Sequence, residues 1–196
     1  MAQETNVDVL ICGSGSAGLC AAVWLARAGI NFRILESRDG PLQLGQADGV
    51  QARTVEIFES FGLERPLLDE SYHVLELAFW SRGDGGGIQR SRYAPDLMPG
   101  LSHQPHVILN QARVNMLMIE DIRTSLGGND NIEYEQKVQN VTVDEAAVGD
   151  SDAYCTTVTS VKNGQEHIFR AKYVLVSTCQ NASLLFRFHR LTDPGL

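Results

Sequence analysis

Residues 7–29 read VDVLICGSGSAGLCAAVWLARAG, and this stretch decides the fold. Its first six residues are mostly β-branched or apolar, which is typical of a strand covered on both faces. The alanines and leucines after Gly18 favour a helix, and Gly29 suits the position that ends one. A second apolar stretch, residues 31–35, follows and ends at Glu36. The order of strand, glycine-rich turn, helix and strand predicts a βαβ unit.

Residues 13–18 form a G-x-G-x-x-G pattern, the fingerprint of a dinucleotide-binding turn. In such a turn Gly13 permits the tight bend, Gly15 lets the backbone approach a pyrophosphate, and Gly18 lets helix and strand pack closely. The helix N-terminus supplies N–H groups and partial positive charge to the phosphates. Glu36 lies at the end of the second strand, where it accepts hydrogen bonds from ribose hydroxyls and disfavours the 2′-phosphate of NADP. The dinucleotide site predicted from this unit comprises Gly13, Ser14, Gly15, Ser16, Ala17, Gly18, Glu36, Ser37 and Arg38.

A glycine-rich turn also occurs for purely structural reasons, and the fingerprint alone does not separate FAD from NAD. The spacing of strand, helix, second strand and acidic residue favours dinucleotide binding over a structural turn.

The composition is that of a globular protein: 196 residues, 43% hydrophobic and 20% charged, with a formal net charge of −8. The acidic balance and the absence of a basic run argue against a nucleic-acid partner. No apolar run is long enough for a membrane span, and the N-terminal residues have no basic segment ahead of their apolar stretch. The four cysteines have no Cys-x-x-Cys spacing, so we expect free thiols, no zinc and a cytoplasmic location.

Residues 45–63 read GQADGVQARTVEIFESFGL. This run resembles the second conserved stretch of the group A FAD-dependent aromatic hydroxylases, and it is most similar to the phenol 2-monooxygenase branch, which carries GQADG-x-Q-x-RT-x-E. The resemblance implies an α/β fold: a Rossmann-like FAD/NAD(P)-binding domain of the glutathione-reductase/p-hydroxybenzoate-hydroxylase type, with a β-meander and part of a substrate-domain sheet. It also implies bound FAD, NADPH as reductant, and a phenolic or other aromatic small-molecule substrate.

The resemblance assigns roles to several residues of the middle segment. Asp48 matches the acidic residue beside the substrate hydroxyl, where it would act as a base. Arg53 is expected to pair with the FAD pyrophosphate, and Gln46 and Gln111 to contact the cofactor. The alternatives are a loop-forming aspartate, a solvated arginine and a helix-capping glutamine.

The spacing of apolar residues predicts the elements of this middle segment. Residues 52–61 form a helix with Val55, Phe58 and Phe61 on one face. Residues 72–80 begin as a strand, and residues 85–87 are a hairpin loop. Residues 95–122 echo the hydroxylase pattern PG-x-S…V-x-L-x-Q-x-R, so residues 107–109 should be a short strand. A helix follows over residues 111–126, with a buried stripe made of Val114, Leu117, Met118, Ile122 and Leu126.

Two histidines, His103 and His106, lie in the proline-containing segment between hairpin and helix. No carboxylate or cysteine joins them at a ligand spacing, so we expect solvated side chains and no metal site.

Residues 132–144, 154–161 and 165–176 alternate as strands, with Asn163-Gly164 as a two-residue hairpin turn. We expect a three-stranded meander followed by a returning parallel strand at residues 173–176. The predicted domains are an FAD-binding domain over residues 1–176, interrupted at about 72–106 by a partial substrate-domain segment, and a divergent tail over 177–196.

After this last strand the hydroxylases continue with glycine or alanine and then Asp-Gly, whereas residues 177–183 read STCQNAS. The chain thus resembles a truncated hydroxylase, and a natural short protein is the alternative. Two functions follow: an FAD-dependent monooxygenase, or an FAD-binding remnant or interaction module that associates with a full-length homologue or with itself. The GQADG run argues against a third, an NAD-dependent dehydrogenase fragment.

Overall fold

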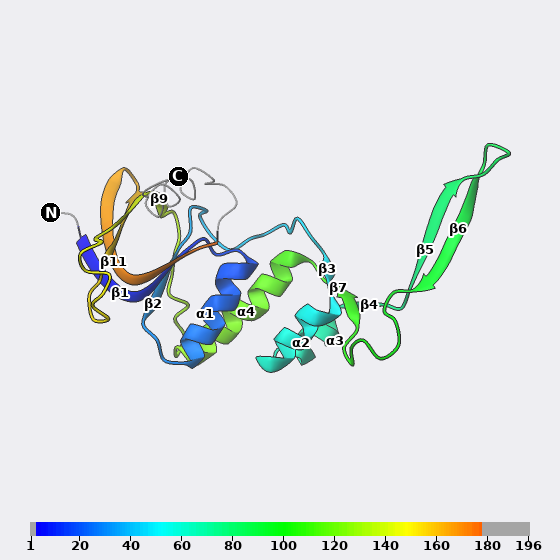
Figure 1. Cartoon of the computed structure of the whole chain (residues 1–196), viewed down its shortest axis with the longest axis horizontal. Helices are drawn as coiled ribbons and strands as arrows, with labels where there is room; N and C mark the ends of the chain where they lie inside the picture. Colours follow the sequence, from blue (N-terminus) through cyan, green and yellow to red (C-terminus); the bar gives the residue numbers. More distant parts are fainter. Residues whose placement is uncertain (1–2, 178–196) are drawn as a thin grey trace. The chain divides into compact units, whose positions relative to one another are not determined.

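A computed structural model describes residues 3–177 of the chain (Figure 1). The described residues divide into two compact units: one contains residues 3–42 and 118–177, and the other contains residues 43–117. In the described residues no helix is both long and apolar enough to cross a membrane.

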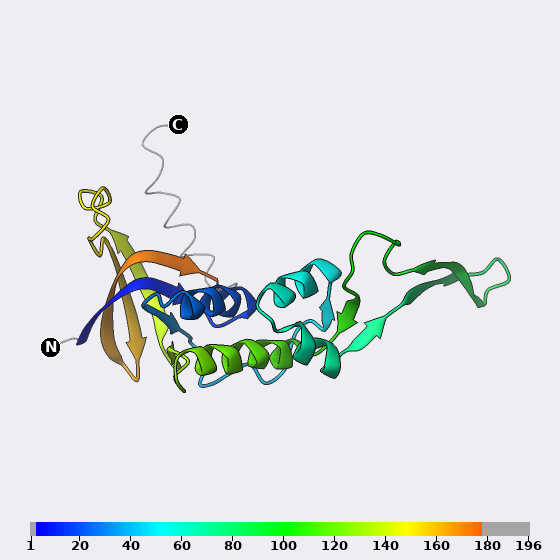
Figure 2. The ribbon, with the colours of Figure 1, turned by 90° about the horizontal axis from the view of Figure 1, so that it is seen from below.

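The first unit is built on a six-stranded mixed sheet in the order β8-β2-β1-β11-β10-β9, with helix α1 connecting β1 to β2. Strands β8, β2, β1 and β11 are parallel to one another, β10 is antiparallel to β11, and β9 is antiparallel to β10. Figure 2 shows the long curved strand β11 beside β10 at one side of this unit. The predicted βαβ unit is therefore confirmed. The bounds are β1 Gln3–Cys12, α1 Ser16–Arg27, β2 Phe32–Leu35, β8 Ile132–Glu133, β9 Lys137–Val143, β10 Thr156–Lys162 and β11 Gln165–Val176.

Strand β11 corrects one prediction. The third meander strand and the returning parallel strand are a single element of 12 residues, which pairs with β10 through its first half. It pairs with β1 over nearly its whole length, from Gln3 opposite His167 to Cys12 opposite Val176. The Asn163-Gly164 turn is confirmed, since both residues have positive φ, 52° and 76°, as a type I′ hairpin requires.

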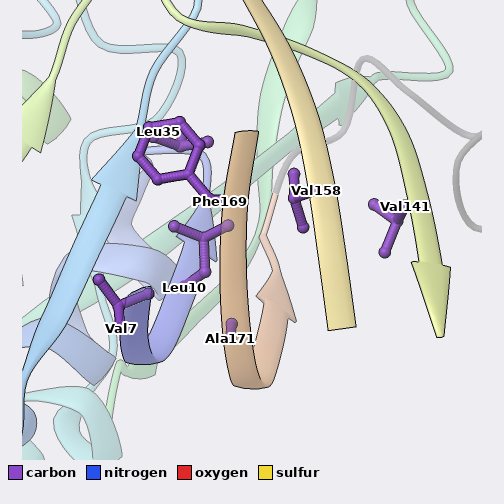
Figure 3. Close-up of a cluster of buried hydrophobic side chains, with 7 residues drawn as sticks. All are labelled: Val7, Leu10, Leu35, Val141, Val158, Phe169 and Ala171. Carbon is purple, nitrogen blue, oxygen red and sulfur yellow. The ribbon is translucent and has the colours of Figure 1, made fainter. Parts of the chain in front are cut away.

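One buried cluster joins the parallel and antiparallel halves of this sheet (Figure 3). Phe169 of β11 is 2% exposed, and Val158 of β10 and Leu10 of β1 are fully buried. Burial of one such side chain contributes about 1.5–3 kcal/mol, so the meander is held by apolar packing as well as by its hydrogen bonds. The cluster consists of Val7, Leu10, Leu35, Val141, Val158, Phe169 and Ala171.

The second unit contains a small antiparallel sheet in the order β3-β7-β4, two short helices and a separate hairpin. Val55, Phe58 and Phe61 are all buried, which confirms the predicted apolar face of α2. Helix α3 was not predicted; its Pro66 lies in the first turn, where proline is tolerated. The bounds are β3 Gly49–Val50, α2 Ala52–Ser60, α3 Glu64–Glu70, β4 Tyr72–Val74, β5 Glu76–Arg82, β6 Ile88–Pro95 and β7 His106–Ile108.

The β5–β6 ribbon confirms the hairpin loop at the glycine run, where the Gly83 N–H donates to the Gly87 carbonyl at 2.7 Å. Every residue of β5 is exposed, including Phe79 and Trp80. Because an isolated two-stranded hairpin is marginally stable in water, this ribbon is the least supported element of the unit.

Helix α4 spans Gln111–Ser125, one residue shorter than predicted, and its residues are shared between the two units. The predicted stripe is buried except for Leu126, which follows the helix and is half-buried. At its C-terminal half, Asp121 accepts two hydrogen bonds from Arg27 of α1, at 3.1 and 2.6 Å.

Candidate functional site

The glycine turn between β1 and α1 is held by close backbone packing. Gly13 has φ 107°, a conformation that other residues rarely adopt, and its N–H donates to the Leu35 carbonyl at 2.8 Å. A Cβ placed on Gly18 would lie 2.2 Å from the Gly13 oxygen and 3.1 Å from a methyl carbon of Ile11. Gly18 is thus glycine because helix and strand approach each other too closely for a side chain.

Gly15 differs from its two neighbours in the fingerprint. As the N-cap residue of α1 it has φ −74° and ψ 175°, an extended conformation open to any residue. A Cβ there would meet only the Ser177 carbonyl oxygen, at 3.8 Å. Within residues 3–177 the packing therefore does not demand glycine at position 15, whereas a pyrophosphate approaching the backbone at the start of α1 does. The local geometry fits a dinucleotide.

Glu36 is 5% exposed and accepts hydrogen bonds from three residues around it. Its Oε2 accepts from the Ser14 N–H at 2.9 Å, the Ser14 hydroxyl at 2.8 Å and Arg38 Nη2 at 2.9 Å. Its Oε1 accepts from the Arg38 N–H at 3.0 Å and the Ser37 hydroxyl at 3.3 Å. The structure therefore brings together the predicted site residues Ser14, Glu36, Ser37 and Arg38.

These contacts determine the charge of Glu36. Burial raises the pKa of its carboxyl, but the hydrogen bonds from Arg38 and Ser14 outweigh that effect and lower the pKa from 4.5 to about 2. The carboxylate is ionised at neutral pH. Because both oxygens already accept bonds from the chain, a ribose hydroxyl would reach Glu36 by replacing a side-chain donor, while the two backbone donors stay in place.

The loop that carries Asp48 is seated on the start of α4. The Gln46 N–H donates to Gln111 Oε1 at 3.0 Å, and the Gln111 N–H donates to the Ala47 carbonyl at 3.0 Å. A Cβ on Gly45 would lie 2.7 Å from the Gln111 Cβ, so only glycine lets the loop approach this closely. Gln46, Asp48 and Gln111 thus belong to one local structure, in which Gln111 holds the loop.

Asn110 is a residue of this site that the sequence analysis missed. Its Oδ1 accepts from the Ala112 N–H at 2.9 Å, which makes it the N-cap of α4, and its Nδ2 faces Asp48 Oδ1 at 3.4 Å. The Asp48 carbonyl accepts from the Leu109 N–H at 2.8 Å, and the Asp48 side chain is exposed. An asparagine directly before a predicted helix was the available signal.

Arg53, expected at a pyrophosphate, lies in the first turn of α2 with 82% of its side chain exposed. It forms an ion pair with Glu56, three residues along the same helix. Arg53, Asp48 and Gln111 belong to the second unit, whereas the glycine turn and Glu36 belong to the first.

The solvated state expected for His106 is wrong. Its Nδ1 lies 2.9 Å from Asp96 Oδ2, and the two side chains are only 14% and 9% exposed. His103 is more exposed and lies 2.6 Å from Glu59. The carboxylates of Asp96 and Glu59 do not stand at metal-ligand spacing from the two histidines in the sequence, so these contacts were not predicted. Within residues 3–177 no three His, Cys, Asp or Glu side chains gather as a metal site would require.

The described cysteines, Cys12, Cys20 and Cys155, are free thiols. Burial raises the pKa of Cys12 to about 12 and also raises that of Cys20, so neither is disposed to react as a thiolate. Cys179 lies outside the described residues, as does the predicted tail beyond Ser177.

Comparison with known proteins agrees with this geometry. The profile of a family described as "FAD binding domain" matches residues 6–177. The chain belongs to this FAD-binding domain family. The match covers both the glycine turn and the Asp48 loop, so both units of the structure fall within the FAD-binding domain.

Among curated relatives, the FAD-dependent monooxygenase terD of Aspergillus terreus is 54% identical over 178 residues, covering 89% of this chain and 29% of its own length. The 3-hydroxybenzoate 4-monooxygenase of Comamonas testosteroni is 38% identical over 182 residues, covering 89% of this chain and 28% of its own length. The FAD-binding domain described here thus spans less than a third of these relatives.

Among solved structures, the p-nitrophenol 4-monooxygenase PnpA of Pseudomonas putida has a TM-score of 0.72 at 20% identity, over 89% of this chain and 41% of that one. Aklavinone-11 hydroxylase, solved with FAD and aklavinone, has a TM-score of 0.68 at 22% identity, over 86% of this chain and 32% of that one. These two likenesses establish the fold of the FAD-binding domain.

Proposed function

We propose that this chain binds FAD and forms the FAD-binding part of a monooxygenase that hydroxylates a phenolic or other aromatic substrate with NADPH and O2. The observation that carries the proposal is the glycine turn, where the packing of residues 3–177 requires glycine at positions 13 and 18 but not at position 15. The relatives named as FAD-dependent and 3-hydroxybenzoate monooxygenases support the reaction class.

Each residue of the proposed FAD site has a role that follows from its chemistry. Ser14, Ser16, Ala17 and the three glycines present the backbone at the start of α1 to the pyrophosphate. Glu36, with Ser37 and Arg38 beside it, accepts from a ribose hydroxyl. Gln46 and Gln111, which are hydrogen-bonded to each other, contact the cofactor, and Arg53 contributes positive charge to the phosphates after leaving Glu56.

In the proposed reaction Asp48 accepts the proton of the substrate hydroxyl, which makes the ring carbons more nucleophilic. Asn110 faces its carboxylate and holds the loop, so the acceptor oxygen is presented in one orientation. Bound FAD would take electrons from NADPH and activate O2 for transfer to the ring.

Binding is tested with Gly15→Ala and Gly40→Ala. Among residues 3–177 no atom lies closer than 3.8 Å to a Cβ placed at either position, and both backbones are open to alanine, so both variants should fold as wild type. Titration of FAD, followed by quenching of flavin fluorescence, should show at least about 10-fold weaker binding for Gly15→Ala, because the methyl group occupies the approach of the pyrophosphate. Wild-type protein that binds no FAD, or equal affinities for both variants, would sink the proposal.

The catalytic assignment is tested with Asp48→Asn and a matched control, Asp84→Asn. Asp84 is also an exposed aspartate followed by glycine, in the β5–β6 loop. With FAD and 3-hydroxybenzoate as the probe, NADPH consumption should fall by about 100-fold or more for Asp48→Asn, the usual contribution of a general base, and stay unchanged for the control. Loss in both variants would refute the role of Asp48.

A second candidate function is suggested by the β5–β6 ribbon, whose exposed side chains favour association with another chain. In this case the chain binds FAD without turnover and associates with a longer homologue or a second copy. The exposed β5–β6 ribbon carries Phe79, Trp80 and Tyr93, residue types enriched at interfaces. FAD binding with no substrate-dependent NADPH consumption would favour this function.

For both candidate functions we propose a cytoplasmic location, which would keep the described thiols reduced.

A further inference from the structure

Ser177, the first residue after β11, lies against the glycine turn although it is far from it in the sequence. The pairing of Cys12 with Val176 ends the β1–β11 ladder, and the Ser177 N–H continues it by donating to the Cys12 carbonyl at 2.9 Å. Gly13 follows directly after the end of β1, so the ladder brings the Ser177 side chain beside the turn.

The Ser177 hydroxyl donates to the Gly13 carbonyl oxygen at 2.8 Å, closer than its 3.2 Å approach to the Cys12 carbonyl. The Gly13 carbonyl and the Ser14 N–H belong to the same peptide unit, and that N–H donates to Glu36 at 2.9 Å. The peptide plane between Gly13 and Ser14 is therefore fixed at both edges. Without such contacts a glycine at φ 107° has no side chain to prevent the plane from rotating.

We propose that Ser177 is a positioning residue for the dinucleotide turn: its hydroxyl fixes the Gly13–Ser14 peptide and so presents the following backbone to the pyrophosphate of FAD. This inference rests on the proposed FAD binding.

Ser160 provides a matched control for a serine that only stabilises the fold. It is fully buried in β10 of the same sheet, and its hydroxyl donates at 3.0 Å to Oε1 of Gln136, which is not a residue of the glycine turn. Loss of either hydroxyl removes one hydrogen bond of similar length. Only Ser177→Ala, however, should affect the turn and FAD.

The experiment compares wild type, Ser177→Ala and Ser160→Ala in three measurements: FAD affinity by flavin fluorescence, midpoint of thermal unfolding, and hydrogen exchange of the Gly13 and Ser14 amides. We expect Ser177→Ala to bind FAD about 3- to 10-fold more weakly, the range that one hydrogen bond supports, and to exchange faster at the turn. Ser160→Ala should lower the unfolding midpoint but leave FAD affinity and exchange at the turn unchanged.

Unchanged FAD affinity and exchange in Ser177→Ala would overturn the inference, and so would an equal loss of affinity in Ser160→Ala. If the wild-type chain binds no FAD, the proposed function fails, and exchange at the turn alone decides the role of Ser177. Faster exchange confined to Ser177→Ala would then still support positioning, whereas unchanged exchange would refute it.

Discussion

Gly18→Ala should destabilise the first unit more than any other glycine substitution in the fingerprint. The new Cβ would lie 2.2 Å from the Gly13 oxygen and 2.6 Å from the Ser177 hydroxyl, where real Cβ contacts stay at 3.0 Å or more. The nearest atom is a main-chain oxygen, which cannot rotate away as a side chain could. The Gly13 carbonyl must therefore shift, and its bond to Ser177 is lost.

The size of the effect follows from three contributions. Overpacking costs about 1–3 kcal/mol, with the upper end expected for a backbone clash. The lost hydrogen bond adds about 0.5–1.5 kcal/mol. Replacing glycine by alanine in a helix returns up to about 1 kcal/mol. The net loss in free energy of unfolding should be about 2–3 kcal/mol.

Tryptophan fluorescence during urea unfolding measures this loss. The chain has two tryptophans, Trp24 in α1 and Trp80 in the exposed hairpin. In a Trp80→Phe background Trp24 reports on the first unit alone. Gly40→Ala, which meets nothing within 4 Å, is the control and should change the free energy by less than about 0.5 kcal/mol. If Gly18→Ala unfolds at the same urea concentration as the control, the close packing deduced for the turn is wrong.

Three further predictions follow from single contacts. The pKa of Glu36 is lowered from 4.5 to about 2, so the ionised carboxylate adds up to about 3 kcal/mol to the free energy of unfolding. This contribution is fully present above pH 4.5 and is lost as the pH falls toward 2. Glu36→Gln should remove that part of the pH dependence in acid titrations followed by Trp24 fluorescence, and an unchanged profile would contradict the assignment. Gln111→Glu keeps an acceptor for the Gln46 N–H, whereas Gln111→Leu removes it and should speed hydrogen exchange of the Gln46 amide about 3- to 10-fold. Equal exchange of this amide in the two variants would show that the Gln111 side chain does not hold the loop. Gly164→Val, at φ 76°, should cost about 1–2 kcal/mol in urea unfolding, and no loss would exclude the type I′ turn.

Local patterns were sufficient for the elements whose stability is local. Strand β1, helix α1 and strand β2 follow from apolar composition and one glycine-rich turn, and the Asn163-Gly164 hairpin from residues that accept positive φ. The apolar faces of α2 and α4 follow from helical spacing alone. In each case the residues that determine the element are close to one another in the sequence.

The remaining features depend on which segments meet. That β11 is one strand, not two, is decided by β1, which pairs with it from end to end. The expected solvation of His106 fails because Asp96 folds back onto it. Asn110 could be read as a helix cap, but its contact with Asp48 depends on how the loop is seated.

The sequence by itself determined the dinucleotide-binding βαβ unit and the composition of the glycine turn, because a fingerprint of short spacing encodes both. The choice of FAD over NAD came from the resemblance carried by residues 45–63. The tertiary structure supplied the geometry behind the predicted glycine roles: a Cβ on Gly18 would lie 2.2 Å from the Gly13 oxygen, whereas within residues 3–177 a Cβ on Gly15 would meet only the Ser177 carbonyl oxygen, at 3.8 Å. It also decided how the turn is held, through Glu36 and through Ser177, which is 164 residues from Gly13. A hydrogen bond over that separation is set by the register of β1 and β11, which no local pattern contains.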